Sequence, residues 1–290
     1  MDWEVEKADW PNSDISQFVE TPEAKWHFQK TGAGSKVLLL HGSGATTHSF
    51  EGLMQELRGH HEVLAIDLPG HGFSSELRRV ESSLSNVAVA IGQLLNELDF
   101  APELIVGHSA GAAIAVELVH RSIINPKGFV AINGAFYPFP GFAGSLFPAM
   151  AKLLFLNPLV PSIFAISASR ARVARLMDST GSKLTQKQIH YYERALASSK
   201  HVRGTLAMMA SWQLETMQRK LQKLNVPTCL LIGGADGTID PNASVETEKS
   251  MPSCSRQLLN GFGHLVHEEA PELVSECIRD FWSQNQGLHS

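Results

Sequence analysis

The feature that most constrains the fold is residues 104–111, an apolar run that ends in Gly-His-Ser-Ala-Gly and is followed by small and apolar residues at helical spacing. This order predicts a strand, a tight turn and a helix, the context in which a G-x-S-x-G motif forms a nucleophile elbow. Glycines on both sides of Ser109 remove the Cβ clashes of such a strained turn. We therefore expect the Ser109 hydroxyl to project above the amino end of the helix, where the helix dipole and the N–H of Ala110 favour negative charge.

Strands and helices are expected to alternate around this elbow. Continuous apolar runs are typical of strands buried on both faces, and apolar residues at helical spacing predict the helices between them. After an irregular lead-in at residues 1–22, an alternating run at 26–29 predicts an early antiparallel strand. The other expected strands lie at 36–40, 62–67, 104–108, 128–133, 228–234 and 256–259, and the expected helices at 50–57, 84–98, 112–118, 244–250 and 271–282. The alternation predicts an α/β fold with helices on both faces of a parallel sheet.

The alternation stops near Gly134. From residue 135 to about 224 the sequence shows no convincing strand pattern, and helical patterns are interrupted by five prolines. A segment of this length is too long for a structureless loop in a compact domain. We therefore predict an α/β core formed by residues 1–134 and 225–290, interrupted by a helical insertion at 135–224.

The serine of the elbow needs partners. A serine hydroxyl is a weak nucleophile at neutral pH, so it requires a general base, a carboxylate that orients the base, and N–H donors for the developing oxyanion. Asp236 and His264 each follow an expected strand, at the edge where ligands bind in parallel sheets. We predict that Ser109, His264 and Asp236 form a catalytic triad and that the backbone N–H groups of Ser43 and Ala110 form an oxyanion hole.

Two neighbouring residues compete for the acid and base roles. Asp240 lies four residues after Asp236 and could also reach His264, but Asp236 is closer to the end of its strand. His267 is a second histidine, in a polar run that opens the last helix, where a surface residue is expected. We therefore favour Asp236 and His264.

The composition argues against several classes of function. The 290-residue chain has 43% hydrophobic and 18% charged residues, which is typical of a globular protein. With a net charge of -5 and no basic block, it lacks the electrostatic footprint of a nucleic-acid-binding protein. Three widely spaced cysteines predict a reducing compartment. The sequence has no Cys/His cluster, so we expect no metal site, and we expect no cofactor. The acidic, aromatic start does not resemble a signal peptide, so we expect a cytoplasmic protein.

The motifs together resemble those of the α/β-hydrolase superfamily over nearly the full length of the chain. The matching segments are residues 41–44 (His-Gly-Ser-Gly), 67–72 (Asp-Leu-Pro-Gly-His-Gly), 107–111, Asp236 and 263–264 (Gly-His). Their order of serine, acid and histidine is that of the superfamily. The resemblance implies a mostly parallel eight-stranded sheet with a helical lid inserted after the sixth strand. One departure is Asp240 before Pro241, where such loops more often carry an apolar–proline pair.

Segments outside the shared motifs resemble those of the magnesium chelatase accessory proteins of bacteriochlorophyll biosynthesis. They are residues 1–4, 9–11, 26–27, 45–50, 133–135, 156–161, 181–182 and 208–212. This resemblance implies a place in that pathway, a tetrapyrrole-like ligand and magnesium chelatase as a partner, and any magnesium would then belong to the ligand.

The insertion is unusually apolar, with Phe142, Phe147 and Leu154 among its side chains. These residues either pack the lid onto the core or line a pocket for a large, flat, apolar ligand, and a face resting on a membrane is a third interpretation. The candidate pocket residues are His41, His48, His108, Phe136, Met208, Met209 and Trp212.

Several histidines also have structural interpretations. We expect His41 to orient the oxyanion loop and His71 to stabilise its own loop. For His48, a surface position is the alternative to a place in the pocket wall.

Taken together, the residues predict a cofactor-free serine hydrolase of esterase type that acts on a bulky apolar substrate. The main alternative is a non-catalytic protein that binds a tetrapyrrole or the magnesium chelatase. A further alternative is a cofactor-free haloperoxidase or a carbon–carbon bond hydrolase, because the same fold and elbow serve several reactions.

Overall fold

The structure, a computed structural model, describes residues 1–137, 157 and 159–286. Eight strands form one sheet in the order β1-β2-β4-β3-β5-β6-β7-β8. β2 is antiparallel to both of its neighbours, and the strands from β4 to β8 in this order run parallel. The strands are β1 (Ser16–Glu20), β2 (Lys25–Thr31), β3 (Ser35–Leu40), β4 (His61–Ile66), β5 (Leu104–His108), β6 (Gly128–Ile132), β7 (Thr228–Gly233) and β8 (Cys254–Leu259). The expected α/β architecture, with a mostly parallel eight-stranded sheet, is confirmed.

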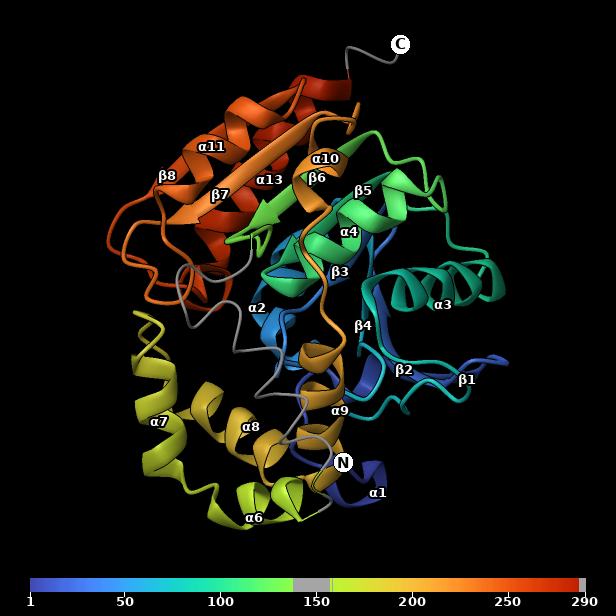
Figure 1. Cartoon of the computed structure of the whole chain (residues 1–290), viewed down its shortest axis with the longest axis vertical. Coiled ribbons are helices and arrows are strands. Elements are labelled where there is room, and N and C mark those ends of the chain that lie inside the picture. Colours follow the sequence, from blue (N-terminus) through green and yellow to red (C-terminus); the bar gives the residue numbers. More distant parts are fainter. Residues whose placement is uncertain (138–156, 158, 287–290) are drawn as a thin grey trace.

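Helices cover both faces of the sheet, and a further group lies together on one side of it (Figure 1). The helices that belong to the core are α1 (Trp3–Glu6), α2 (Glu51–Leu57), α3 (Leu84–Glu97), α4 (Ala110–His120), α11 (Ala243–Ser250), α12 (Val266–Glu269) and α13 (Pro271–Gln286). Those of the insertion are α6 (Val160–Ser167), α7 (Arg170–Asp178), α8 (Gln186–Leu196), α9 (Ser199–Ala210) and α10 (Met217–Leu221). Short 3₁₀ turns lie at Ser13–Ile15 and Thr47–Phe50. No helix of the described ranges has the length and apolarity needed to cross a bilayer.

Alternate side chains of the central strands pack into two separate cores. In β3, Leu38 and Leu40 join the core that contains apolar residues of α3 and α4. Val37 and Leu39 join the other core, with residues of α2 and α13. All four side chains are fully buried. Burial on both faces explains why this strand reads as a continuous apolar run.

The parallel register brings the carboxyl ends of the strands to one edge of the sheet. The end of β3 at Leu40 lies opposite Gly107 in β5, and His108 lies opposite Ile132 in β6. Ile132 in turn lies opposite Leu231 of β7. The loops that carry the predicted site residues therefore leave the sheet side by side.

The lead-in differs from the sequence expectation. Residues 1–22 were expected to be irregular, but they contain the edge strand β1, in which Phe18 pairs with His27 of β2. Most side chains of β1 are only half-buried, so the strand shows no clear apolar alternation in the sequence. Trp10 is buried against the rings of Phe73 and Tyr191, which ties the lead-in to the core and to the insertion.

The insertion is helical and strand-free throughout its described residues, as its sequence pattern predicts. Phe142, Phe147 and Leu154 lie outside the described residues. The domain boundaries at 134/135 and 224/225 stay predictions.

Candidate active site

Ser109 occupies a strained turn between β5 and α4. Its backbone has φ 49° and ψ -114°, a left-handed conformation that is rare for a residue with a side chain. The Ser109 N–H donates to the carbonyl of Ile132 at the end of β6 (3.0 Å), which holds the turn against the sheet. A Cβ at Gly111 would lie 2.0 Å from the carbonyl oxygen of Leu40, so only glycine permits this close packing of helix on strand. The turn has the conformation of a nucleophile elbow.

The structure brings His264 against Asp236. Nδ1 of His264 lies 2.8 Å from Oδ2 of Asp236, whose side chain is almost fully buried. The other carboxylate oxygen of Asp236 accepts the backbone N–H groups of Thr238 and Ile239, at 2.7 and 2.9 Å. Asp240 instead accepts hydrogen bonds from its neighbour Asn242. Of the two aspartates, Asp236 is therefore the one in contact with the histidine.

Asn133 fixes the loop that carries His264, a role that the sequence analysis did not identify. Its side-chain amide donates to the carbonyls of Gly263 (3.1 Å) and His264 (2.8 Å), and its side-chain oxygen accepts the N–H of Gly233 (2.8 Å). Asn133 has a positive φ of 45° directly after β6. Asparagine tolerates this conformation better than most residues, and its position at a strand end is the one sequence signal that could have indicated the role.

The predicted oxyanion donors belong to two segments that adjoin Ser109. A Cβ placed on Gly42 would lie 3.1 Å from the Cβ of Ser109, so the loop that carries Ser43 packs directly on the elbow. The N–H of Ala110 is in the first turn of α4, where no intrahelical acceptor is available. His41 is buried below this loop, where its Nε2 accepts the N–H of Leu68 (3.0 Å), which leaves Nδ1 as the donor to the carbonyl of Gly42 (2.8 Å).

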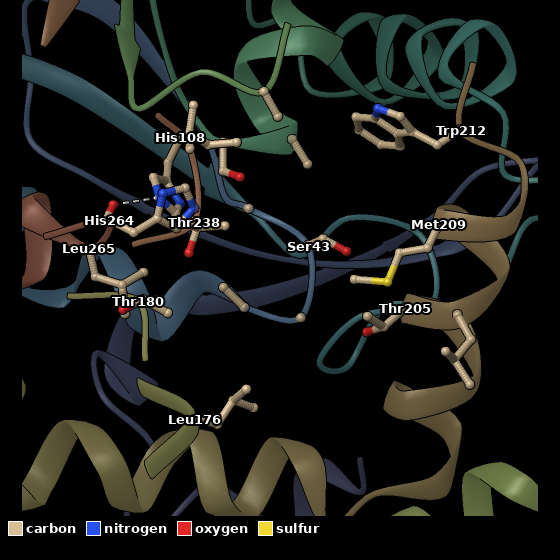
Figure 2. A pocket seen from close by; sticks show the side chains of 18 of the residues that line it. Ser43, His108, Leu176, Thr180, Thr205, Met209, Trp212, Thr238, His264 and Leu265 are labelled. Carbon is tan, nitrogen blue, oxygen red and sulfur yellow. Dashed lines mark hydrogen bonds between the residues drawn. The ribbon is translucent and has the colours of Figure 1, made fainter. Parts of the chain in front are cut away.

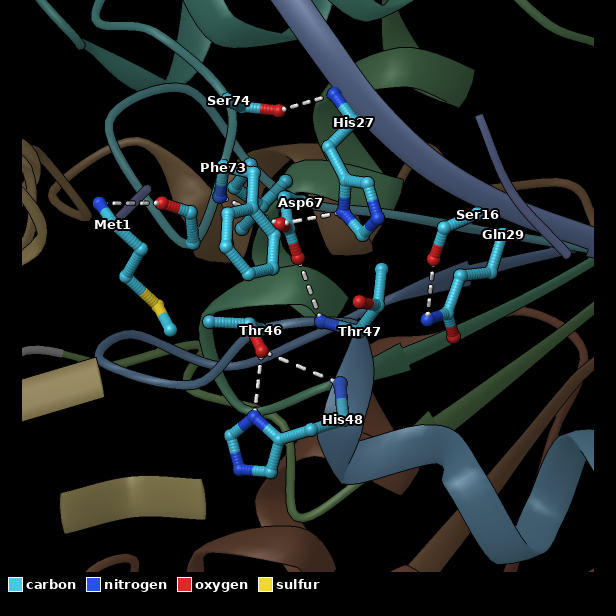
Figure 3. Close-up of polar contacts among 12 residues, drawn as sticks. Met1, Ser16, His27, Gln29, Thr46, Thr47, His48, Asp67, Phe73 and Ser74 are labelled. Carbon is cyan, nitrogen blue, oxygen red and sulfur yellow. Dashed lines mark hydrogen bonds and ion pairs between the residues drawn. The ribbon is translucent and has the colours of Figure 1, made fainter. Parts of the chain in front are cut away.

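Asp67 is bonded to three other segments of the chain, at His27 of β2, Thr47 and Phe73 (Figure 3). It accepts hydrogen bonds from the backbone N–H groups of Thr47 (2.7 Å) and Phe73 (2.9 Å) and lies 2.8 Å from Nδ1 of His27. Burial alone would raise the pKa of Asp67, but the neighbouring His27 and His41 and these hydrogen bonds hold it well below its ordinary range. Asp67 is therefore an anionic anchor for this end of the site.

A cavity of about 500 Å³ opens over Ser109 between the core and the insertion. His108 and His264 lie on one side of it and Met209 and Trp212 on the other, with Ser43 between them (Figure 2). Of the predicted site residues, those that line the cavity are Ser43, His108, Ser109, Ala110, Met209, Trp212 and His264. Among the described lining residues, Glu215 is the only Asp, Glu, Lys or Arg, and its side chain is exposed.

Four predicted pocket residues lie outside the cavity. His41 is buried, and its ring is hydrogen-bonded to the backbone of Gly42 and Leu68. His48 is buried, not on the surface, with its ring against Trp10 and Tyr192 and a 2.6 Å hydrogen bond to Thr46. Phe136 and Met208 are buried in the core that contains α3 and α4. Met208 differs from Met209 because successive residues of a helix point in different directions.

His267 also differs from the expectation, because it is fully buried and not a surface residue. Its ring contacts those of His108, at 4.3 Å between centroids, and Phe50, at 5.3 Å, both at a tilted angle. Burial lowers the pKa of His267 to about 3, so the ring is neutral at pH 7. His108 is neutral for the same reason, since burial lowers its pKa, and its Nε2 lies 3.0 Å from the carbonyl of His264. His71 is buried and lies 3.1 Å from the carbonyl of Pro69, a contact within its own loop.

The insertion contributes directly to the geometry of the site. The carbonyl of Thr180 accepts the N–H groups of both Gly237 (2.9 Å) and His264 (3.1 Å). It therefore links the loop that contains Asp236 and Gly237 to the loop that contains His264. The Ser182 hydroxyl accepts the N–H of Leu265 (2.8 Å). Because most of these bonds involve backbone atoms, the sequence contains little signal for them.

His201 on α9 connects the insertion to two loops of the core. Its Nδ1 accepts the N–H of Gly72 (3.0 Å), and its Nε2 donates to the carbonyl of Gly44 (3.1 Å) next to the oxyanion loop. Both bonds require the neutral ring with its proton on Nε2. Burial lowers the pKa of His201 to about 4, which is consistent with that state. The sequence analysis did not single out this residue.

The chain belongs to the α/β-hydrolases, since residues 33–271 match the family described as serine aminopeptidase, S33. It is 34% identical to the magnesium-chelatase 30 kDa subunit (BchO) of Rhodobacter capsulatus, with 97% of this chain and 99% of that protein covered. It is 25% identical to pimeloyl-(acyl-carrier protein) methyl ester esterase of Vibrio vulnificus, with 88% and 97% covered. Both resemblances expected from the sequence are therefore confirmed.

Solved structures share the fold. An alpha/beta hydrolase fold protein from Burkholderia ambifaria is 18% identical, with a TM-score of 0.75 and 92% of this chain and 98% of that chain covered. A haloalkane dehalogenase loop variant from Bradyrhizobium elkanii is also 18% identical, with a TM-score of 0.73 and 94% and 98% covered. At this level of identity the likeness concerns the fold alone.

Proposed function

We propose that the chain is a serine hydrolase that cleaves an ester or a related acyl bond in a bulky apolar substrate. Ser109 attacks the carbonyl carbon, and His264 accepts the serine proton and later gives it to the leaving group. Asp236 orients His264 and stabilises its charged form. The N–H groups of Ser43 and Ala110 stabilise the oxyanion. The observation that carries the proposal is the buried 2.8 Å contact of Asp236 with His264, beside a strained elbow serine that opens onto the same cavity.

The serine and the histidine act together in the first step of the cycle, because His264 must take the Ser109 proton as Ser109 attacks. In the described residues the Ser109 hydroxyl has no hydrogen bond to His264, although both line the cavity. Such bonds are often long or poorly aligned without substrate and tighten in the complex. After the acyl-enzyme forms and the leaving group departs, a water molecule gives its proton to His264 and attacks the acyl carbon. His264 then gives this proton to Ser109 Oγ as the bond between Ser109 and the acyl carbon breaks and the acid product leaves.

The cavity lining favours an uncharged substrate group. Among its described lining residues there is no lysine or arginine to pair with a substrate carboxylate, and burying an unpaired charge is costly. We therefore propose that the part of the substrate beside Ser109 is neutral and apolar. A tetrapyrrole would meet this condition if its carboxylates were esterified or lay outside the cavity.

A second candidate function is that of a non-catalytic accessory protein for magnesium chelatase or a tetrapyrrole. The likeness to the magnesium-chelatase 30 kDa subunit favours it. On this likeness we also propose that the protein takes part in bacteriochlorophyll biosynthesis, whichever of the two functions it has. A haloperoxidase or carbon–carbon bond hydrolase would use the same elbow and remains a third hypothesis.

Labelling with a serine-directed phosphonate separates hydrolase from accessory protein. We expect mass spectrometry to find the label on Ser109 of the wild type and no label on Ser109→Ala. Asp236→Asn should lower kcat on a neutral aryl ester by about 10³-fold or more, by analogy with the loss of a triad aspartate. The matched variant Asp240→Asn should stay within about twofold. An unlabelled Ser109, or equal losses for both aspartate variants, would contradict the catalytic assignment.

Complementation of a deletion strain tests the pathway. Wild type should restore pigment, and Ser109→Ala should leave a tetrapyrrole intermediate that identifies the substrate. If Ser109→Ala restores pigment as well as the wild type does, the accessory function is the correct one.

A further inference from the structure

The outer face of α6 carries exposed apolar side chains. Leu159, Ile163 and Ile166 are 65%, 63% and 87% exposed. Their spacing of four and three residues places them on one side of the helix. The buried residues of α6 are Pro161 and Ala165, which lie on its inner side. Figure 1 shows α6 on the side of the insertion that faces away from the sheet.

The next helix adds positive charge beside this face. Arg170, Arg172 and Arg175 of α7 are all exposed. Arg170 and Arg172 donate to the backbone carbonyls of Gln186 and Ser167, and none of the three has an ion pair with a carboxylate of the described residues. From residue 159 to residue 177 the sequence contains three arginines and no acidic residue, within a chain whose net charge is -5.

We propose that α6 and the first two turns of α7 form a surface that binds anionic lipid membranes. In this arrangement Leu159, Ile163 and Ile166 enter the interface between headgroups and acyl chains, and the arginines contact lipid phosphates. Apolar side chains next to unpaired cations are the pattern by which helices lie on a membrane surface. A stable protein interface involves about 20–30 residues on each side. Among the described residues, three side chains form the outer apolar face of α6, so a lipid surface is the better match.

The same two helices also form part of the cavity wall. Val160 and Phe164 of α6 and Leu176 of α7 line the cavity above Ser109. An apolar substrate dissolved in the bilayer would therefore meet the cavity next to the docking surface. This last step rests on the proposed hydrolase function, but membrane binding itself does not.

Vesicle co-sedimentation of the full chain tests the proposal. The probes are vesicles of phosphatidylcholine with and without phosphatidylglycerol, at low and at high salt. One variant combines Ile163→Ser with Ile166→Ser, and a second combines Arg170→Gln, Arg172→Gln and Arg175→Gln. The matched control combines Arg79→Gln with Val80→Ser, two residues that are also exposed but lie between β4 and α3. Thermal unfolding by circular dichroism checks that each variant is folded.

We expect the wild type to bind the anionic vesicles and to be released by salt. Each arginine near the surface contributes about a fivefold change in partitioning, so the triple variant should bind about 100-fold more weakly. The double isoleucine variant should lose at least about tenfold, and the control should stay within about twofold. Ser109→Ala should bind like the wild type, which separates this result from the test of catalysis.

Three results would overturn the proposal. They are no binding to anionic vesicles, equal binding to neutral vesicles, and binding that neither variant weakens. If vesicles are not bound but the α6 and α7 variants alter the size of the protein in gel filtration, the surface contacts protein and the lipid assignment is wrong.

Discussion

Gly181 of the insertion packs closely against the loop that carries Asp236. Its φ is +78°, and a Cβ there would lie 1.9 Å from the carbonyl oxygen of Ala235, next to Asp236. In Gly181→Ala the left-handed backbone costs about 1–2 kcal/mol. The steric overlap adds about 1–3 kcal/mol, as overpacking usually does. We therefore expect Gly181→Ala to lower the free energy of unfolding by about 2–5 kcal/mol.

Gly261 provides a matched control. Its φ is +85°, but a Cβ there would have no atom within 4 Å. Gly261→Ala should therefore lose only the backbone contribution of about 1–2 kcal/mol. The free energy of unfolding of each variant is measured in urea. The difference between the two losses gives the steric contribution at Gly181, because the backbone contribution is common to both variants.

Activity of the same two variants tests the role of the segment. Any shift of Gly181 moves the carbonyl of Thr180, which hydrogen-bonds to both the acid loop and the histidine loop. Because small misplacements of catalytic groups are costly, kcat on a neutral ester should fall about tenfold or more in Gly181→Ala and stay within about twofold in Gly261→Ala. The reasoning is refuted if the two variants lose equal stability, or if Gly181→Ala is destabilised with kcat unchanged.

Three further predictions concern buried titratable groups. His201→Ala leaves the buried N–H of Gly72 and the half-buried carbonyl of Gly44 without this partner, and it should lower the free energy of unfolding by about 2–5 kcal/mol in urea. His190→Ala, at a half-exposed site, should lower it by less than about 0.5 kcal/mol. Burial lowers the pKa of His201 to about 4, so the unfolded chain binds the proton first, and stability is lost as the pH falls from about 6.5 to about 4. The slope of the unfolding free energy against pH in this range should correspond to about one proton fewer in His201→Ala than in the wild type. Burial raises the pKa of Glu268 to about 8, so its contribution to stability is lost as the pH rises from about 4.5 to about 8. Glu268→Gln should unfold at higher urea than wild type at pH 8, unlike the exposed control Glu272→Gln.

The sequence predicted the parts of the site that depend on the order of strands and loops. Ser109, Asp236 and His264 each follow a parallel strand, so the sheet topology alone brings them to one edge. The buried position of His267 could not be predicted, because a polar run beside a helix start gives no sign that rings from two other segments enclose it. Asn133 acts through side-chain bonds to residues 100 and 130 positions away, which no local pattern reveals.

The predicted fold class is confirmed, but the sequence missed details in which packing overrides the local pattern. The edge strand β1 has no clear alternation because most of its side chains are only half-buried. Met208 and Met209 have the same chemistry, yet only the second reaches the cavity, since the outcome depends on how α9 is rotated against the core. The general architecture is thus encoded locally, and the cavity wall is set by contacts between distant segments.

The hydrogen bonds of Thr180 have a consequence for how such proteins diversify. A cap that only covered a cavity could be exchanged between relatives by recombination at its two ends. Here the insertion also supplies the Thr180 carbonyl, which bonds to both the loop after Asp236 and the loop that carries His264. A transplanted insertion would therefore have to reproduce these two hydrogen bonds to keep the two loops in place. Substrate range and catalytic alignment would then be inherited as one unit, and chimeras that keep residues 180–182 with the core should tolerate foreign helices better than those that do not.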